Sequence, residues 1–269
     1  MISTAVTSAA WKGAFEGPLS GVLGIVGFLA TWEAVCRTGL IDDRYIPPAS
    51  TVIVTAIGYF GNLEFWSALG RTLSGWALGL LIAAVAAIAL GIVIGSSEFL
   101  RKATHSTIEF LRPIPSVALI PLAVLVFGTS LNSTLLLVIY ASFWQILIQV
   151  LYGVGDIDPV AADTARSYRL GLVARVRYLV WPTALPYVMT GLRLGAAVAL
   201  ILAITAELVI GGGGLGELIA LAKSGGAIDK LYALILITGL LGVIINVGMR
   251  AIARKALSWH ISVRGETAA

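Results

Sequence analysis

Residues 113–155 read PIPSVALIPLAVLVFGTSLNSTLLLVIYASFWQILIQVLYGVG and contain no charged side chain. A helix that crosses about 30 Å of hydrocarbon needs about 20 mostly apolar residues. The 43 residues of this stretch are therefore long enough for two crossings. The polar residues 128–133 in its middle predict the turn that joins them. The stretch predicts a membrane-spanning helical hairpin.

Four further stretches meet the same length criterion, and Glu33 and Arg193 are the only charged residues within them. They are residues 19–35, 73–94, 184–206 and 231–249. All of these runs are continuous and rich in Leu, Ala, Ile and Gly, whereas the strands of a membrane barrel alternate apolar and polar residues. The sequence therefore predicts an all-α membrane protein with six transmembrane helices.

The composition of the 269-residue chain supports the same class of protein. Apolar residues make up 58% of it and charged residues 12%, against about 25% charged residues in soluble domains. This excludes a water-soluble globule and a disordered chain. Cys36 is the single cysteine and the two histidines, His105 and His260, are far apart in sequence, so neither an intrachain disulfide nor a cluster of metal ligands is expected.

The positions of Lys and Arg predict the orientation of the chain. Twelve of the 18 lie in four alternate segments, and five lie in the segments between them. The basic segments are residues 1–18, 95–113, 152–181 and 250–269. Because cytoplasmic loops carry the excess of basic residues, both termini are predicted to be cytoplasmic. This also explains the net charge of +4 without a nucleic-acid partner.

The chain is predicted to consist of one membrane domain, residues 19–257. A cytoplasmic N-terminal segment, residues 1–18, precedes it, and a cytoplasmic tail, residues 258–269, follows. On the outside, Pro47 and Pro48 predict a rigid turn. Ser50 is a candidate cap for a short interfacial helix that continues to Tyr59.

Enzyme functions find little support in the sequence. No Gly-x-x-x-x-Gly-Lys-[Ser/Thr] motif is present, so the chain is not expected to bind ATP by a P-loop of its own. Gly211, Gly213 and Gly216 satisfy Gly-x-Gly-x-x-Gly. They follow a lipid-spanning helix rather than a strand, which favours a flexible external loop over a dinucleotide site. We therefore expect a non-catalytic chain with no cofactor of its own.

The most informative cytoplasmic segment is residues 156–182. Asp158 is a good N-cap and Pro159 suits the first turn, so a short helix is predicted to begin there, and Gly171 is a plausible stop. A short helix with mixed faces beside a membrane is suited to a groove on a partner protein. The alternative is a solvated loop whose arginines only follow the positive-inside rule.

The spacing of this segment resembles the EAA loop of ABC-importer permeases, with Asp163, Thr164 and Ala165 at the Glu-Ala-Ala positions and Pro182 in register. Other blocks resemble the nitrate, sulfonate, taurine and bicarbonate group of these permeases in the same order along the chain. They are Tyr45-Ile46-Pro47-Pro48-Ala49, Leu69-Gly70-Arg71-Thr72-Leu73-Ser74-Gly75, Leu111-Arg112-Pro113-Ile114-Pro115, Pro121-Leu122, Ala165-Arg166-Ser167-Tyr168, Leu185-Pro186, Thr190-Gly191-Leu192-Arg193, Ala206-Glu207 and Gly214-Leu215-Gly216.

The resemblance implies the transmembrane domain of a type I ABC importer in a prokaryotic plasma (inner) membrane. It implies a second permease copy, most simply in a homodimer, and two ATPase subunits that bind ATP and Mg²⁺. It also implies a periplasmic or lipid-anchored solute-binding protein, and a small anionic solute. The residues that would couple to the ATPase are Asp163, Thr164, Ala165, Arg166, Ser167, Tyr168, Arg169 and Gly171.

One position departs from the family pattern, because Arg169 stands where the family has a glycine. A left-handed backbone at that position would strain a non-glycine residue, so the turn is expected to shift to Gly171. Arg166 and Arg169 are candidates for ion pairs with carboxylates of the ATPase, and the positive-inside rule explains them equally well.

The translocation pathway is expected between spans of the two copies. Its candidate polar residues are Ser142, Gln145, Gln149, Thr190, Arg193 and Glu207. An arginine inside a span is costly unless it faces water or a partner. Arg193 therefore contacts an anion, bonds to helix-end carbonyls or extends to the cytoplasmic side. For Glu207, a role as a structural partner or as a docking point for the binding protein is favoured over contact with the solute.

Prolines predict irregular backbone in two spans. Pro113, Pro115 and Pro121 lie in the third span, and Pro182 and Pro186 lie at the start of the fifth. Each proline frees a backbone carbonyl, which allows either a hinge or a static kink. The alternative to an ABC permease is a stand-alone channel or secondary carrier, which would work without an ATPase.

Overall fold

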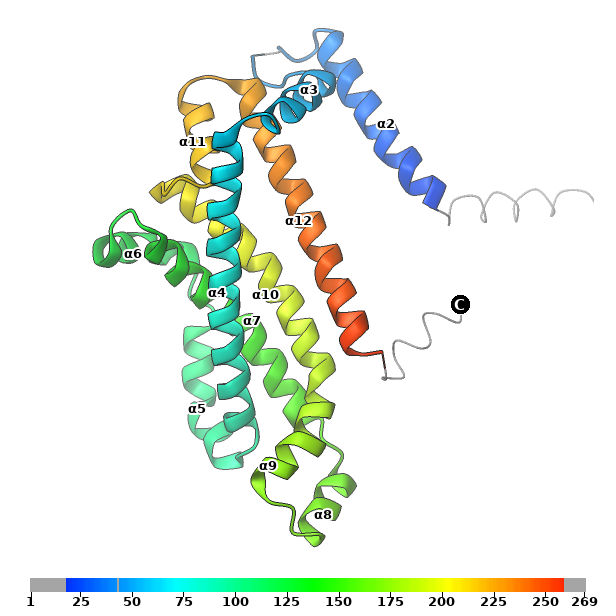
Figure 1. The fold of residues 1–269 in the computed structure, drawn as a ribbon, viewed down its shortest axis with the longest axis vertical. Coiled ribbons are helices and arrows are strands. Elements are labelled where there is room, and N and C mark those ends of the chain that lie inside the picture. Colours follow the sequence, from blue (N-terminus) through cyan, green and yellow to red (C-terminus); the bar gives the residue numbers. More distant parts are fainter. Residues whose placement is uncertain (1–17, 43, 259–269) are drawn as a thin grey trace, which may run out of the picture. The chain divides into compact units, whose positions relative to one another are not determined.

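The computed structural model describes residues 18–42 and 44–258, and within these ranges every regular element is a helix (Figure 1). Five helices are long and apolar enough to cross a membrane. They are α2 (Pro18–Arg37), α4 (Leu63–Gly95), α7 (Leu131–Gly155), α10 (Trp181–Ile210) and α12 (Ile228–Ala256). The predicted all-α membrane class is confirmed. The predicted terminal segments lie outside the described residues, except for residues 18 and 258.

The described chain divides into two compact units. The larger unit contains residues 62–221 and 237–258, and its helices α4, α7 and α10 pack on one another. The smaller unit contains residues 18–42, 44–61 and 222–236, with α2 and α3 (Ala49–Tyr59) as its main contact. Helix α11 (Leu215–Ser224) and α12 each have residues in both units.

Glycines of α4 allow α4 and α7 to approach closely. A Cβ atom built on Gly79 would lie 2.9 Å from Cβ of Val138, and one on Gly91 would lie 2.8 Å from Cβ of Val150. Lipid tails are as apolar as leucine, so the association of membrane helices depends on close packing of small residues. The glycines therefore place valine side chains of α7 against the α4 backbone.

Helices α7 and α10 meet through a second set of small residues. A Cβ atom built on Gly153 would lie 2.9 Å from Cα of Ala184. The Ser142 hydroxyl donates a hydrogen bond to the Gly195 carbonyl at 3.3 Å, and Trp76 Nε1 of α4 donates to the Ala196 carbonyl at 2.9 Å. Hydrogen bonds between the helices thus add to the packing of α4, α7 and α10.

A further helix precedes the third predicted span. Residues 95–113, which are predicted to be cytoplasmic, contain α5 (Glu98–Leu111), which packs along α4. A bend of 78° separates α5 from the segment formed by η1 (Ser116–Leu119) and α6 (Ile120–Phe127). By length and composition the bent pair is suited to one broken span or a re-entrant loop, so the described residues contain five candidate spans, or six if the pair counts as one.

Proline chemistry explains the bend. Pro115 has no N–H to donate to the Leu111 carbonyl four residues earlier, and Pro113 likewise leaves the Glu109 carbonyl without its helical donor. The Tyr140 hydroxyl of α7 donates a hydrogen bond of 2.6 Å to the Leu111 carbonyl. The predicted irregularity of the third span is confirmed. In place of its helical donor, the Leu111 carbonyl has the Tyr140 hydroxyl and the Ile114 amide, which donates at 3.2 Å.

The predicted turn at residues 128–133 is shorter than expected. Gly128 has a φ of +67°, which glycine adopts without strain, and α7 begins at Leu131. The buried Ser133 hydroxyl bonds to the carbonyls of Ala123 and Gly128, at 3.1 and 2.5 Å. The turn therefore joins α6 to α7, which pack on each other.

The fifth span begins earlier than predicted. Helix α9 (Leu172–Arg175) continues into the π-helical segment η2 (Val176–Val180) and then into α10. Pro182 occupies the first turn of α10, and Pro186 lies inside the helix. A π-helical turn shifts the hydrogen-bond pattern by one residue. The predicted irregularity at the start of this span is confirmed.

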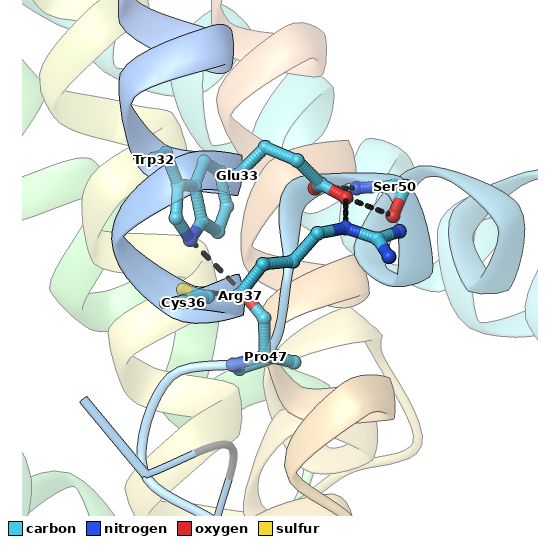
Figure 2. Close-up of polar contacts among 6 residues, drawn as sticks. All are labelled: Trp32, Glu33, Cys36, Arg37, Pro47 and Ser50. Carbon is cyan, nitrogen blue, oxygen red and sulfur yellow. Dashed lines mark hydrogen bonds and ion pairs between the residues drawn. The ribbon is translucent and has the colours of Figure 1, made fainter. Parts of the chain in front are cut away.

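In the smaller unit, Glu33 of α2 caps the N-terminus of α3 (Figure 2). Its carboxylate accepts hydrogen bonds from the Ser50 amide at 3.0 Å and the Ser50 hydroxyl at 2.8 Å. The predicted short helix is confirmed as α3, but the predicted role of Ser50 as its cap is wrong. The N-cap residue is Pro48, which has no capping side chain, and Ser50 donates to Glu33 instead. An anion at a helix N-terminus is favoured by the helix dipole.

Two further bonds fasten α2 to the turn before α3. Trp32 Nε1 donates to the Pro47 carbonyl at 3.1 Å, and the buried Cys36 thiol donates to the same carbonyl at 3.8 Å (Figure 2). Arg37 Nε also donates to the Glu33 carboxylate, at 2.6 Å. The turn predicted from Pro47 and Pro48 is thus held by α2.

Glu33→Ala is expected to lower the stability of the α2–α3 contact by about 1 to 2 kcal/mol, because the first turn of α3 loses the acceptor for two donors. Hydrogen exchange of the purified protein measures this as faster exchange of the first-turn amides of α3. Arg37→Ala is the matched control, since it removes an exposed ion pair worth about 0 to 1 kcal/mol. Equal effects of the two variants would contradict the capping role.

Candidate functional site

The short helix predicted in the coupling loop, residues 156–182, is α8 (Pro159–Ser167). Its predicted start is confirmed, because the Asp158 carboxylate accepts a hydrogen bond of 3.1 Å from the Val160 amide and Pro159 occupies the first turn. The predicted stop at Gly171 is wrong. The helix ends at Ser167, and Gly171 is the N-cap of α9.

The turn after α8 stays at Arg169 and does not shift to Gly171. Arg169 has a φ of +51°, whereas Gly171 has a φ of −63°. The Leu170 amide donates to the Ala165 carbonyl at 3.0 Å, and the Arg169 amide donates to the Arg166 carbonyl at 2.9 Å. These two bonds form a Schellman motif, which requires the left-handed residue. The bonds therefore hold Arg169 in a conformation that costs a non-glycine residue about 1 to 2 kcal/mol.

The other predicted coupling residues lie on α8 or directly after it. Asp163 and Arg166 form an ion pair of 3.0 Å with both side chains exposed, and Thr164 donates to the Val160 carbonyl at 2.8 Å. Ala165 is buried, whereas Ser167 and Tyr168 are exposed. The segment thus has one buried contact, at Ala165, and presents charged and aromatic side chains at its surface.

Exposed apolar side chains lie on the same segment of the chain as this ion pair. The exposed fraction is 79% for Tyr168, and it exceeds 70% for Val160, Leu172 and Val173 as well. Exposed apolar side chains that gather with charged ones are typical of protein interaction sites. We name this set, Val160, Tyr168, Leu172 and Val173, the apolar surface of the coupling loop. It lies on α8, α9 and the turn between them (Figure 1).

The structure separates the six predicted pathway residues into two groups. Ser142 and Glu207 are buried within the larger unit, and their side chains bond to other helices or loops. Gln145 and Gln149 are half-buried, and Thr190 and Arg193 are exposed. The Thr190 hydroxyl donates to the Pro186 carbonyl of its own helix at 3.0 Å. A pathway role for these residues stays a prediction.

Arg193 has a partner that sequence reasoning missed. Its Nε donates a hydrogen bond of 3.1 Å to the Asn246 side-chain oxygen of α12. A single asparagine in an apolar span has no spacing relation that would pair it with an arginine 53 residues earlier. The only feature of the sequence that pointed to Asn246 was that it is a polar residue within an apolar span. The pair joins α10 to α12 within the larger unit.

Glu207 lies in a buried cluster with Thr72. The Thr72 hydroxyl donates to the Glu207 carboxylate at 2.8 Å and accepts from the Leu215 amide at 2.9 Å. The Gly216 amide donates to the same carboxylate at 3.1 Å, and the Gly213 amide donates to Glu217. The glycine-rich segment, residues 211–216, was expected to be a flexible loop. The bonds of Leu215 and Gly216 join the end of this segment to α4 and α10.

The long apolar helices define an integral membrane protein. The chain belongs to the family described as binding-protein-dependent transport system inner membrane component, which matches residues 83–258. The resemblance seen in the sequence motifs is thus confirmed at the level of the family.

Individual relatives extend the similarity to nearly the whole chain. The taurine transport system permease protein TauC of Escherichia coli K12 is 29% identical over 260 residues, which cover 94% of each chain. The bicarbonate transport system permease protein CmpB of Synechocystis is 28% identical over 254 residues, 89% of each chain. The putative ABC transporter permease protein MJ0413 of Methanocaldococcus jannaschii is 34% identical over 185 residues, 68% of each chain.

Solved structures agree on the fold. A chain of the MetNI methionine ABC transporter, in an inward-facing conformation, superposes with a TM-score of 0.63 at 16% identity. The match covers 72% of this chain and 96% of that one. The chain is a permease subunit of a binding-protein-dependent ABC importer, with the fold of a type I importer transmembrane domain.

Proposed function

We propose that this permease conducts a small anionic solute into the cell. One observation carries the proposal. The chain is similar to permeases named for taurine, aliphatic sulfonates, bicarbonate and nitrate, and each of these solutes carries a compact anionic group. The exposed Arg193 on α10 supports it, since a guanidinium inside a span is suited to an anion.

In this proposal the permease itself catalyses no reaction. A separate pair of ATPase subunits binds ATP and Mg²⁺ and hydrolyses the nucleotide, and an external solute-binding protein delivers the solute. Two copies of the permease, most simply a homodimer, enclose the pathway. Both termini lie on the cytoplasmic side, in agreement with the distribution of Lys and Arg.

The coupling loop transmits the motion of the ATPases. Both ends of α8 are fixed, by the Asp158 cap at its start and the Schellman motif at its end, so the helix is suited to move as one body. The apolar surface of the coupling loop and the Asp163–Arg166 pair form its contact with the ATPase. Motion of α8 reaches α10 through α9 and η2, which are continuous with it in the chain.

Reconstitution tests the solute class. The permease, its ATPase and its solute-binding protein are placed in liposomes, and ATP-dependent uptake of labelled taurine, bicarbonate and nitrate is measured beside a neutral sugar. We expect uptake of at least one of the three, dependent on both ATP and the binding protein. Uptake of the sugar alone would contradict the anionic class, and uptake without the ATPase would identify a channel or secondary carrier.

Arg169→Glu tests the docking of the coupling loop. A like charge placed against a carboxylate of the ATPase costs several kcal/mol, so solute-stimulated ATP hydrolysis is expected to fall about ten-fold or more. Arg169→Lys keeps the charge and the non-glycine backbone cost, and is expected to retain most activity. Arg254→Glu, on the exposed surface of α12, is the matched control. Unchanged assembly and hydrolysis in Arg169→Glu would remove Arg169 from the docking surface.

A further inference from the structure

Arg193 lies near the middle of the apolar run of α10. Residues 178–192 before it and residues 194–206 after it are uncharged, which is 15 and 13 residues. At 1.5 Å per residue these flanks are about 22 and 20 Å long. The hydrocarbon layer of a bilayer is about 30 Å thick, so it is longer than either flank. Any placement of this run across a bilayer therefore puts the Arg193 backbone inside the hydrocarbon.

The positive charge of Arg193 is not neutralised by a carboxylate. In the part of the chain that the structure describes, its side chain forms no ion pair, and its Nε donates to the neutral Asn246. The nearest carboxylates along these two helices are Glu207, 14 residues after Arg193, and Asp229, 17 residues before Asn246. They are about 21 and 25 Å away along the helix axes. The nearest charge to Asn246 on α12 is another cation, Arg250.

The face of α10 that carries Arg193 does not pack on α7. Cβ atoms built on Gly191 and Gly195 would lie 3.1 and 3.0 Å from atoms of Ile146 of α7, whereas Thr190 and Arg193 are exposed. Residues three apart are neighbours on a helix surface, so Thr190 and Arg193 share this polar face. Hydrocarbon offers no acceptor for their hydrogen bonds. The face is therefore suited to a water-filled space and not to lipid.

Asn246 limits the orientation of the Arg193 guanidinium. The bond from Nε to the Asn246 side-chain oxygen uses one of the five N–H donors and leaves the four on the two terminal nitrogens. A guanidinium binds two oxygens of a carboxylate, sulfonate or nitrate through parallel N–H donors, whereas a lysine ammonium is a point charge. The pair thus presents one edge of the guanidinium in the geometry that an oxyanion requires.

We propose that Arg193 is an anion contact of the translocation pathway and that Asn246 is its positioning residue. The two terminal nitrogens of Arg193 bind two oxygens of the solute anion. Asn246 holds this edge toward the pathway and acts through Arg193 without contact to the solute. The assignment rests on the proposed function, because it gives the anionic solute class a binding site within the span.

A thiol beside Arg193 tests whether this face meets water. Thr190→Cys in a Cys36→Ala background provides one thiol in each permease copy. The permease–ATPase complex is placed in phosphatidylcholine nanodiscs, which leave both membrane faces open, and is treated with 2-sulfonatoethyl or 2-(trimethylammonium)ethyl methanethiosulfonate. Each rate is divided by the rate of the same reagent with free cysteine. The anionic reagent is expected to be favoured, and a thiol that neither reagent reaches would overturn the proposal.

Arg193→Gln is expected to lower the ratio of the anionic to the cationic rate about five-fold, since a unit charge about 8 Å away in water changes the local concentration of each reagent about two-fold, in opposite directions. Arg193→Lys keeps the charge and should keep the ratio. Asn246→Asp gives the retained arginine a countercharge and should show the same fall, so the result does not depend on the folding of one variant. Arg254→Gln, in the last turn of α12, is the matched control. An unchanged ratio in both Arg193→Gln and Asn246→Asp would overturn the proposal.

Protection by nitrate separates the positioning role from the charge. Nitrate is expected to slow the anionic reagent more than chloride of the same concentration does, and equal slowing by the two salts would contradict an oxyanion site. Asn246→Leu keeps the reagent ratio but should need about five-fold more nitrate for the same protection, because the guanidinium must then be ordered on binding. Asn132→Leu, in the first turn of α7, is the matched control. Equal protection in these two variants would remove Asn246 from the site.

A lipid headgroup is the other source of an oxyanion. Slowing of the anionic reagent that appears only when phosphatidylglycerol is added to the nanodiscs would assign Arg193 to a lipid phosphate and overturn the proposal. The solute class is judged separately, by ATP-dependent uptake through the wild-type complex. Failure of the site at Arg193 would therefore leave the proposed function standing.

Discussion

Gly216→Ala is expected to lower the free energy of unfolding by about 3 kcal/mol, which is the largest effect predicted for this chain. A Cβ atom at position 216 would lie 2.7 Å from Cβ of Glu207 and 2.7 Å from the Leu208 amide nitrogen, and still closer to the Ile204 carbonyl. Two of these atoms belong to the α10 backbone and cannot rotate away, so the helices must separate. Separation would also break the 3.1 Å bond from the Gly216 amide to Glu207.

The apparent melting temperature of the detergent-purified permease measures this effect, with size-exclusion chromatography as a check of monodispersity. Gly70→Ala is the matched control, because Gly70 also lies in a helix and has no atom within 4 Å of its Cβ position. Alanine is favoured over glycine in a helix by about 1 kcal/mol, so the control should be neutral or stabilising. Similar melting temperatures for the two variants would contradict the packing of Gly216 on α10.

Gly79→Ala is expected to cost about 2 kcal/mol, and a second substitution on α7 should recover part of the loss. The added methyl group would lie 2.9 Å from Cβ of Val138, inside the contact between α4 and α7. Val138→Ala alone leaves a small cavity and costs about 1 kcal/mol. In the double variant each change offsets the other, so it should be more stable than Gly79→Ala.

A double-mutant cycle measures the interaction between these two positions through their melting temperatures. Residues in contact typically show interaction energies of about 0.5 to 3 kcal/mol. Additive effects would mean that position 79 does not contact position 138. Gly70→Ala again serves as the control on α4, because it faces open space.

Features that depend on residues close together in the sequence could be predicted from it. The apolar runs that became α4, α7 and α12 were found by length, because a span is defined by the thickness of the hydrocarbon. The start of α8 was found because Asp158 bonds to an amide two residues away. The prolines indicated where the third and fifth spans are irregular, since each removes a donor from its own helix.

The candidate sites depended on residues far apart in the chain. Thr72 bonds to Glu207 135 residues later, and Arg193 bonds to Asn246. Glu33, not Ser50, provides the cap of α3. The charged segment before Pro113 is predicted to be cytoplasmic, but its helix and the packing of this helix against α4 came only from the structure.

The sequence by itself determined the membrane class, the approximate positions of the spans, the family and the location of the coupling loop. Hydrophobic length and local capping act over one or two helical turns, so these properties can be read from the order of residues. The tertiary structure alone decided the partners of Glu33, Glu207 and Arg193. Side chains far apart in sequence meet only after the helices pack.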